Sequence, residues 1–83
     1  MKPERTHLFK QQCEKLRPSQ KDQCVEVIKK ILNDPEIGTP GTEEFRKYLH
    51  VSYEDKYGKR VISYRRIGDR IRFISNFQIS LKI

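Results

Sequence analysis

Five arginines lie close together near the end of this sequence, in the segment KRVISYRRIGDRIRFISNF. They are Arg60, Arg65, Arg66, Arg70 and Arg72. A guanidinium group presents its N–H donors in a planar fork that matches the oxygens of a phosphate group. A hairpin that only had to fold would not require so many arginines. We therefore predict that this segment carries a phosphate-binding surface.

Other polar side chains near this segment are candidates for chemistry. His50 can act as a general acid or base, although a lone strand histidine is more often a surface or half-buried residue. Tyr57 and Lys59 flank the arginines and are candidate nucleic-acid contacts, since a tyrosine in a loop can stack on a base. Tyr64 is expected in the core instead. Glu54 and Asp55 favour a turn beside Gly58 over a catalytic carboxylate pair.

The arginine segment reads as a β-hairpin, because β-branched and aromatic residues fill both arms around Gly68-Asp69. With a two-residue loop, Tyr64 pairs with Phe73, and one face carries Ile62, Tyr64, Ile71, Phe73 and Phe77. With a three-residue loop, Tyr64 pairs with Arg72. The second register places Arg60, Arg66, Arg70 and Arg72 on one face. In both registers Arg70 and Arg72 lie opposite Phe73.

The charge is unevenly distributed along the 83 residues, which are expected to form one domain, 1–83. Residues 1–44 hold eight basic and eight acidic residues, whereas residues 45–83 hold ten basic and three acidic ones, which gives the whole net charge of +7. This asymmetry predicts a basic face in the second half, suited to nucleic acid or to an acidic partner. The alternative is that Lys and Arg only keep a small sheet soluble.

Several classes of protein are not indicated. The sequence has no apolar run long enough for a membrane helix and no signal-peptide core, so a cytoplasmic protein without membrane contact is expected. Cys13 and Cys24 have no CxxC spacing, and they are expected to be free thiols and not metal ligands. No phosphate-binding glycine loop and no catalytic triad occurs. We expect neither a metal nor another cofactor.

The order of predicted elements is helix, helix, strand, strand, strand. Thr6 can cap a helix that ends near Leu16, and Ser19 can cap a second helix that ends near Leu32. Residues 1–5 are expected to be loose and residues 34–44 to form a loop. Alternating apolar residues predict a strand over 45–53. The fold class is therefore α+β, with an N-terminal helical hairpin packed on a small curved antiparallel sheet of three to four strands.

This order of elements resembles the RelE/ParE superfamily of toxins from type II toxin–antitoxin modules. The helical half FKQQCEKLRPSQKDQCVEVIKKILNDPEIGTP is similar to the first half of that family, with its break at Leu-x-Pro. The segment GKRVISYRRIGDRIRFISNF is similar to the family's strands. The resemblance covers about Phe9 to Phe77 and implies a small curved sheet with two helices against it.

The resemblance also implies a function. RelE-like members enter the ribosome and cut mRNA, and an antitoxin protein neutralises them, so the expected partners are a cognate antitoxin, mRNA and ribosomal RNA. Arg60 matches the strand arginine that holds the scissile phosphate. Lys47 falls near lysines of the preceding strand, although the match is loose. Arg70 and Arg72 match no catalytic position and are expected to contact phosphate or ribosomal RNA.

The end of the chain departs from the family pattern. RelE-like chains continue past the last strand with residues that do acid–base work, whereas this chain ends SNFQISLKI. Phe77 and Lys82 are only faintly similar to the ending of HigB-like relatives, and Lys82 is a further candidate nucleic-acid contact. This departure keeps two alternatives open. One is a ParE-like inhibitor of DNA gyrase without enzymatic activity, and the other is an RNA-binding module without toxicity.

Overall fold

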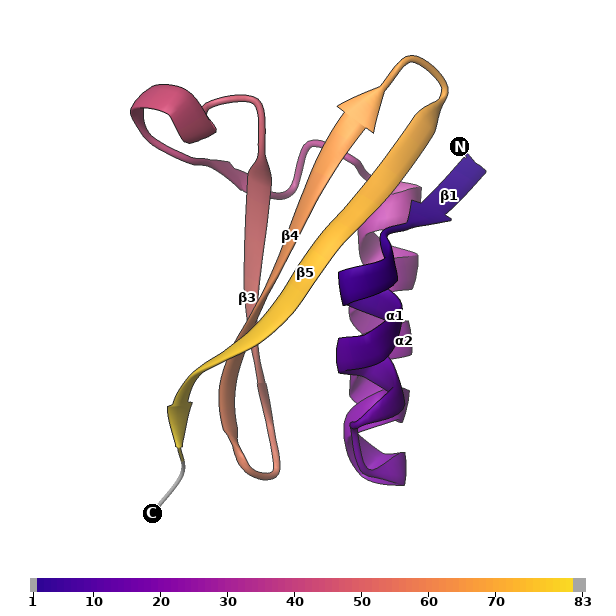
Figure 1. Ribbon diagram of the computed structural model, residues 1–83, viewed down its shortest axis with the longest axis vertical. Helices are drawn as coiled ribbons and strands as arrows, with labels where there is room; N and C mark the ends of the chain where they lie inside the picture. The colour runs from indigo at the N-terminus through magenta and orange to yellow at the C-terminus, as the bar shows by residue number, and fades with distance from the viewer. Residues whose placement is uncertain (1, 82–83) are drawn as a thin grey trace.

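The computed structural model describes residues 2–81, which form two helices on one side of a mixed sheet (Figure 1). The helices are α1 (His7–Glu14) and α2 (Pro18–Asn33). The strands are β1 (Lys2–Arg5), β2 (Thr39–Pro40), β3 (Leu49–Asp55), β4 (Gly58–Ile67) and β5 (Arg70–Leu81), in the sheet order β1-β5-β4-β3-β2. The predicted α+β class is confirmed. Lys82 lies outside the described residues.

The sheet has five strands and is mixed, so the prediction of an antiparallel sheet with three or four strands is wrong. A strand also precedes the two helices, which the predicted order did not include. Residues 1–5 were predicted to be loose, but residues 2–5 form β1, which runs parallel to β5 and pairs with its first half. A polar segment with Pro3 can form an edge strand, because one side of such a strand has no neighbouring strand. There the missing N–H of a proline costs no hydrogen bond. Residues 34–44 were predicted to be only a loop, but Thr39 and Pro40 pair with β3 as the other edge.

The strand predicted over 45–53 begins later, at Leu49. Residues 43–45 instead form a short 3₁₀ helix, η1 (Glu43–Phe45), in which the backbone N–H of Phe45 donates to the carbonyl of Thr42. Tyr48 donates in turn to the carbonyl of Phe45, so the chain turns before β3 starts. The alternating pattern misled because Phe45 is exposed and packs on no core. Lys47 therefore lies in a turn and not on a strand.

The helix starts follow local chemistry only in part. The Thr6 cap is confirmed, since its hydroxyl accepts the backbone N–H of Phe9 at 3.1 Å. The second helix begins at Pro18 and not after a Ser19 cap. Proline suits the first helical turn because its missing N–H would have no partner there, and it keeps Arg17 extended. The first helix accordingly ends at Glu14 and not at Leu16.

The register of the arginine hairpin is the one with a two-residue loop, in which Ile67 pairs with Arg70 and Tyr64 with Phe73. A bulge then follows, because Ser63 pairs with Ser75 and leaves Ile74 unpaired. An inserted residue reverses which side chains face the core beyond it. The prediction that Phe77 shares the buried face is therefore wrong. Phe77 is 51% exposed, and the neighbouring Asn76 is 1% exposed.

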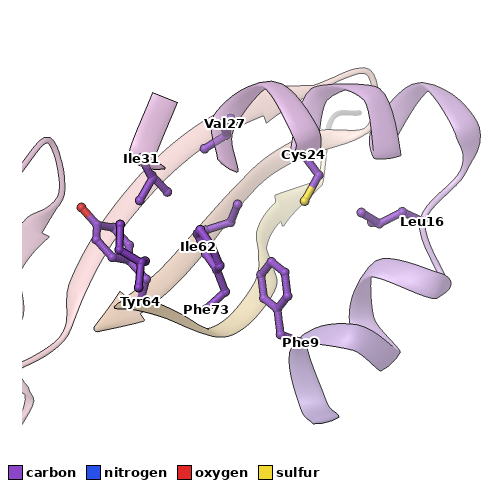
Figure 2. Close-up of a cluster of buried hydrophobic side chains, with 9 residues drawn as sticks. Phe9, Leu16, Cys24, Val27, Ile31, Ile62, Tyr64 and Phe73 are labelled. Atoms are coloured by element: carbon purple, nitrogen blue, oxygen red, sulfur yellow. The ribbon is translucent and has the colours of Figure 1, made fainter. Parts of the chain in front are cut away.

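The core lies between the two helices and the sheet (Figure 2). Its most buried apolar side chains are Phe9, Ile31, Ile62, Tyr64, Ile71 and Phe73. Tyr64 is in the core as predicted, and its hydroxyl donates to the carbonyl of Pro35 at 2.7 Å. That hydroxyl also accepts the N–H of Gly38 at 3.0 Å, which fixes the loop after α2. No helix within residues 2–81 is long and apolar enough to cross a membrane.

Candidate phosphate-binding site

Arg60 occupies a buried position on β4, where its backbone pairs with Tyr53 on one side and Gln78 on the other. The residue is only 9% exposed. Its Nε donates to Oδ1 of Asn76 at 2.8 Å, and its Nη2 donates to the backbone oxygen of Asn76 at 3.1 Å. These two hydrogen bonds fix the plane of the guanidinium. Its remaining N–H groups do not bond to Asn76.

Among residues 2–81, no carboxylate forms an ion pair with Arg60. The ion pairs found within residues 2–81 involve other arginines and a lysine, and none reaches Arg60. A buried cation without a counter-charge is costly, so such groups are usually paired or serve a ligand. An anion that approached the free N–H groups would meet donors that are already oriented. Arg60 therefore has the environment of an anion-binding residue.

A cavity of about 400 Å³ opens in front of Arg60. It lies between the C-terminal end of α1, the start of β4 and the end of β5. Its lining residues are Gln12, Lys15, Leu16, Arg17, Gln20, Tyr57, Arg60, Asn76, Phe77, Gln78 and Leu81. Lys15, Arg17 and Arg60 supply three cations, and none of the described residues that line it is acidic. We call this set the Arg60 cavity. Its volume and charge suit one or two nucleotide phosphates.

Two contacts lock the connection between the helices onto the turn between β3 and β4. The side chain of Gln20 accepts the backbone N–H of Arg17 at 3.0 Å and donates to Oδ2 of Asp55 at 3.1 Å. Oδ1 of Asp55 accepts the backbone N–H of Tyr57 at 2.8 Å, as its predicted turn role requires. The position of Tyr57 in this turn is thus set by Asp55, and Gln20 links the turn to α2.

The rim of the Arg60 cavity is built from Arg17 and Tyr57. The Arg17 guanidinium carbon lies 4.5 Å from the centre of the Tyr57 ring, within cation–π range. Nη1 of Arg17 also donates to the Tyr57 hydroxyl at 3.3 Å. Stacking on Tyr57 keeps the Arg17 charge at the mouth of the cavity, where an incoming phosphate would meet it first.

The structure separates the other two predicted catalytic residues from Arg60. Leu49, Val51 and Tyr53 of β3 pack on the core, so His50 between them lies on the opposite face of the sheet. There its Nδ1 is 2.8 Å from the hydroxyl of Ser63. Lys47 lies in the turn before β3 with its Nζ 5.5 Å from the centre of the Tyr48 ring. Neither lines the Arg60 cavity.

Most of the remaining predicted contacts lie away from the cavity, and acidic residues pair with several of them. Glu4 of β1 lies 3.5 Å from Arg70 and 3.7 Å from Arg72. Glu36 forms an ion pair with Arg66. Arg65 lies opposite Arg72 on the face away from the helices, and Lys59 lies opposite Glu54. Of the predicted site residues within 2–81, only Arg60 and Tyr57 line the cavity.

Sequence reasoning missed the residues that complete the site. Asn76 was not singled out, since its burial depends on the bulge at Ile74. Lys15 was not singled out either, and Arg17 was interpreted only as part of the Leu-x-Pro break between the helices. The hydroxyl of Tyr53 accepts a hydrogen bond from Nδ2 of Asn76 at 2.9 Å. Burial raises the pKa of Tyr53 to about 12, so its phenol stays neutral.

The comparison with known proteins rests on the fold. No protein-family model matches the sequence, and no curated protein matches it either. A chain in the crystal structure of the intact E. coli RelBE toxin–antitoxin complex superposes with a TM-score of 0.78 at 12% sequence identity. The match covers 95% of this chain and 96% of the other. This chain therefore has the RelE-like toxin fold, as the resemblance in its sequence predicted.

Proposed function

We propose that this chain is the toxin of a type II toxin–antitoxin module and that it acts as a ribosome-dependent mRNA endoribonuclease. One observation carries the proposal: the buried guanidinium of Arg60, held by Asn76, faces an open cavity with two further cations. The RelE-like fold supports it, because a toxin–antitoxin complex has the same architecture. A phosphodiester is the ligand that best matches three cations around one cavity.

The reaction we propose is attack of a ribose 2′-hydroxyl on the adjacent phosphate. The new O–P bond gives a 2′,3′-cyclic phosphate, and the P–O bond to the 5′-oxygen of the next nucleotide breaks. The 2′-hydroxyl gives up its proton to a base, and the departing 5′-oxygen takes up a proton to become a hydroxyl. Arg60 holds the phosphate and stabilises the charge that develops on its oxygens in the transition state. Arg17 and Lys15 neutralise the neighbouring charge and position the strand. The cavity offers the hydroxyl of Tyr57 and the amine of Lys15 for proton transfer. Lys47 and His50 have no part in this step, because they lie outside the cavity.

The proposed protein partner is a cognate antitoxin with an acidic segment. The cations of the Arg60 cavity and the exposed side chains of Phe77 and Leu81 at its rim suit a segment that mixes acidic and apolar residues. Such a segment would compete with RNA for Arg60. The RNA partners in this proposal are mRNA and the ribosomal RNA around it, which the arginines on the opposite face would contact.

A second candidate is an inhibitor that binds its target without cleaving RNA. It is favoured by the composition of the cavity, since none of the described residues that line it is a histidine or a carboxylate, the commonest general bases. In the ParE-like version of this candidate the target is DNA gyrase. Arg60 would then bind an acidic group of the target protein.

The test is a pulse of induced expression in bacteria, followed by primer extension on an abundant translated mRNA. The proposal expects growth arrest and discrete new 5′ ends inside the reading frame, both lost in Arg60→Ala. Lys29→Ala is the control, because Lys29 is an exposed cation on α2 that lies outside the cavity and outside the arginine face of the sheet. Arrest with intact mRNA would favour the inhibitor. Expression without growth arrest would contradict both candidates and favour an RNA-binding module without toxicity.

A further inference from the structure

The two cysteines, 11 positions apart in the sequence, come together in the fold. Cys13 lies on α1 and Cys24 on α2, and the connection through residues 15–17 folds the two helices against each other. Their Sγ atoms are 3.9 Å apart and unbonded. Figure 2 shows the Cys24 side chain pointing from α2 into the buried cluster. Two cysteines that only filled the core would not need to lie in contact. The contact therefore suggests a role for the pair.

A second cavity, of about 360 Å³, is lined by both cysteines. Its lining residues are Arg5, Phe9, Lys10, Cys13, Glu14, Leu16, Lys21, Cys24, Val25 and Ile28. Arg5, Lys10 and Lys21 outnumber the single acidic residue, so the cavity favours a thiolate over a thiol. Cys13 is half-buried and forms the accessible part of the pair, whereas Cys24 is only 3% exposed. A molecule as small as hydrogen peroxide fits this space.

Hydrogen-bond donors surround the sulfur of Cys24. Nδ2 of Asn76 donates to it at 3.4 Å. The hydrogen bond with Cys13 lowers the pKa of the Cys24 thiol most, and the final value is about 7. Asn76, Tyr53 and the charge of Arg60 act in the same direction, while burial opposes them. The shared hydrogen bond and burial raise the pKa of Cys13. Cys24 is thus the thiol that ionises first.

We propose that Cys13 and Cys24 form a redox pair that hydrogen peroxide closes into a reversible intramolecular disulfide. The Cys24 thiolate attacks one oxygen of the peroxide and breaks the O–O bond. This step gives a sulfenic acid on Cys24, and the released hydroxide takes up a proton to become water. The sulfur of Cys13 then attacks the sulfenic sulfur and expels a second hydroxide, which takes the Cys13 proton. Two thiols and one peroxide become one disulfide and two water molecules.

The second step starts from two sulfur atoms that are already in contact. The sulfur atoms must approach from 3.9 Å to about 2.05 Å, the length of a disulfide bond. The Cys24 sulfur that must move also accepts the hydrogen bond from the amide of Asn76. That amide also anchors Arg60, so the oxidation state of the pair is connected to the phosphate-binding site by two successive hydrogen bonds.

The test uses the full-length protein, reduced and then treated with one equivalent of hydrogen peroxide. Mass spectrometry under non-reducing conditions should show a monomer lighter by two hydrogen atoms, with the Cys13 and Cys24 peptides linked, and dithiothreitol should restore both thiols. Two outcomes would overturn the proposal. One is a disulfide between two molecules, and the other is a sulfinic acid on one cysteine beside a free thiol on the other.

The order of reaction is tested with two matched variants and dimedone, a reagent that traps sulfenic acids. In Cys13→Ser, Cys24 should give the dimedone adduct about tenfold faster than Cys13 gives it in Cys24→Ser. Equal and slow labelling would mean that the pair only fills the core. Circular dichroism checks that both variants are folded, and the wild-type mass measurement decides the proposal if either is not. None of these measurements depends on RNA cleavage, so the redox pair and the proposed nuclease can fail separately.

Discussion

The guanidinium of Arg60 is held by Asn76 through one contact to the side chain and one to the main chain. Nε donates to Oδ1 at 2.8 Å, and Nη2 donates to the backbone oxygen at 3.1 Å. The same amide donates from Nδ2 to the sulfur of Cys24 and to the hydroxyl of Tyr53. One buried amide therefore orients the candidate phosphate-binding group and also contacts the dithiol.

Replacing Asn76 should separate orientation from charge at Arg60. In Asn76→Ala the guanidinium loses its side-chain acceptor, so we expect about tenfold weaker binding of a single-stranded RNA oligonucleotide. The Nε–H group of Arg60 is then buried without an acceptor, which should lower the free energy of unfolding by about 1–3 kcal/mol. Fluorescence titration and urea unfolding measure the two effects.

The Asn76→Asp variant is the sharper comparison. Its carboxylate would pair with Arg60 and neutralise the cavity, so RNA binding should fall further than in Asn76→Ala while more of the stability is kept. Gln78→Ala is the stability control, since the exposed Gln78 side chain bonds only backbone oxygens. RNA affinity equal to the wild type in Asn76→Asp would contradict a phosphate role for Arg60.

The turn after β3 depends on a glycine that no other residue can replace without strain. Gly58 has φ +145°, and a Cβ there would lie 2.1 Å from the backbone oxygen of Ser80. Gly58→Ala should therefore lower the free energy of unfolding by more than about 2 kcal/mol. Gly68→Ala is the matched control, because Gly68 has φ +58° and nothing within 4 Å of the added atom. It should cost only about 1 kcal/mol, and equal losses in urea unfolding would contradict this difference.

The coupled thiols should make stability depend on pH. The pKa of Cys24 falls from 9.0 to about 7 on folding, so between these values the folded state binds fewer protons and stability rises with pH. The pKa of Cys13 is raised on folding, so above pH 9 the folded state keeps a proton that the unfolded state loses, and stability falls. We expect a maximum near pH 9 in urea unfolding of the reduced protein.

The control for this pH dependence is the double variant Cys13→Ser, Cys24→Ser. It should lack the rise between pH 7 and pH 9, which in the wild type should amount to at most about 2 kcal/mol. Identical curves for the two proteins would show that both cysteines titrate as they do in the unfolded chain. A reductant must be present throughout, because the disulfide would remove the titration.

Glu4 should weaken RNA binding on the face away from the helices. It lies within ion-pair distance of both Arg70 and Arg72, which it partly neutralises. Glu4→Gln should raise the affinity for single-stranded RNA about threefold at low salt, and the gain should disappear as salt increases. The stability change should stay below about 1 kcal/mol, because the guanidinium ends of both pairs are about half exposed to solvent, which screens them. Unchanged affinity would mean that RNA does not reach this face.

Much of the local structure followed from the sequence alone. The capping threonine at position 6, the apolar stripes of two helices and the Gly68-Asp69 turn are each decided by residues a few positions apart. Local propensity and turn chemistry act over that range, so the α+β class and the position of the turn were predictable, whereas both hairpin registers stayed open. The number of arginines pointed to the segment as a whole, and the family resemblance singled out Arg60 within it.

Only the tertiary structure decided which residues share the site. The parallel pairing of Lys2–Arg5 with β5 and the bulge at Ile74 join segments distant in sequence, and no local pattern fixes them. The bulge reverses the faces of β5, which exposes Phe77 and brings Asn76 under Arg60. Packing of α1 on α2 likewise sets the distance between Cys13 and Cys24. Long-range strand pairing therefore completed a site of which the sequence had indicated only Arg60 and Tyr57.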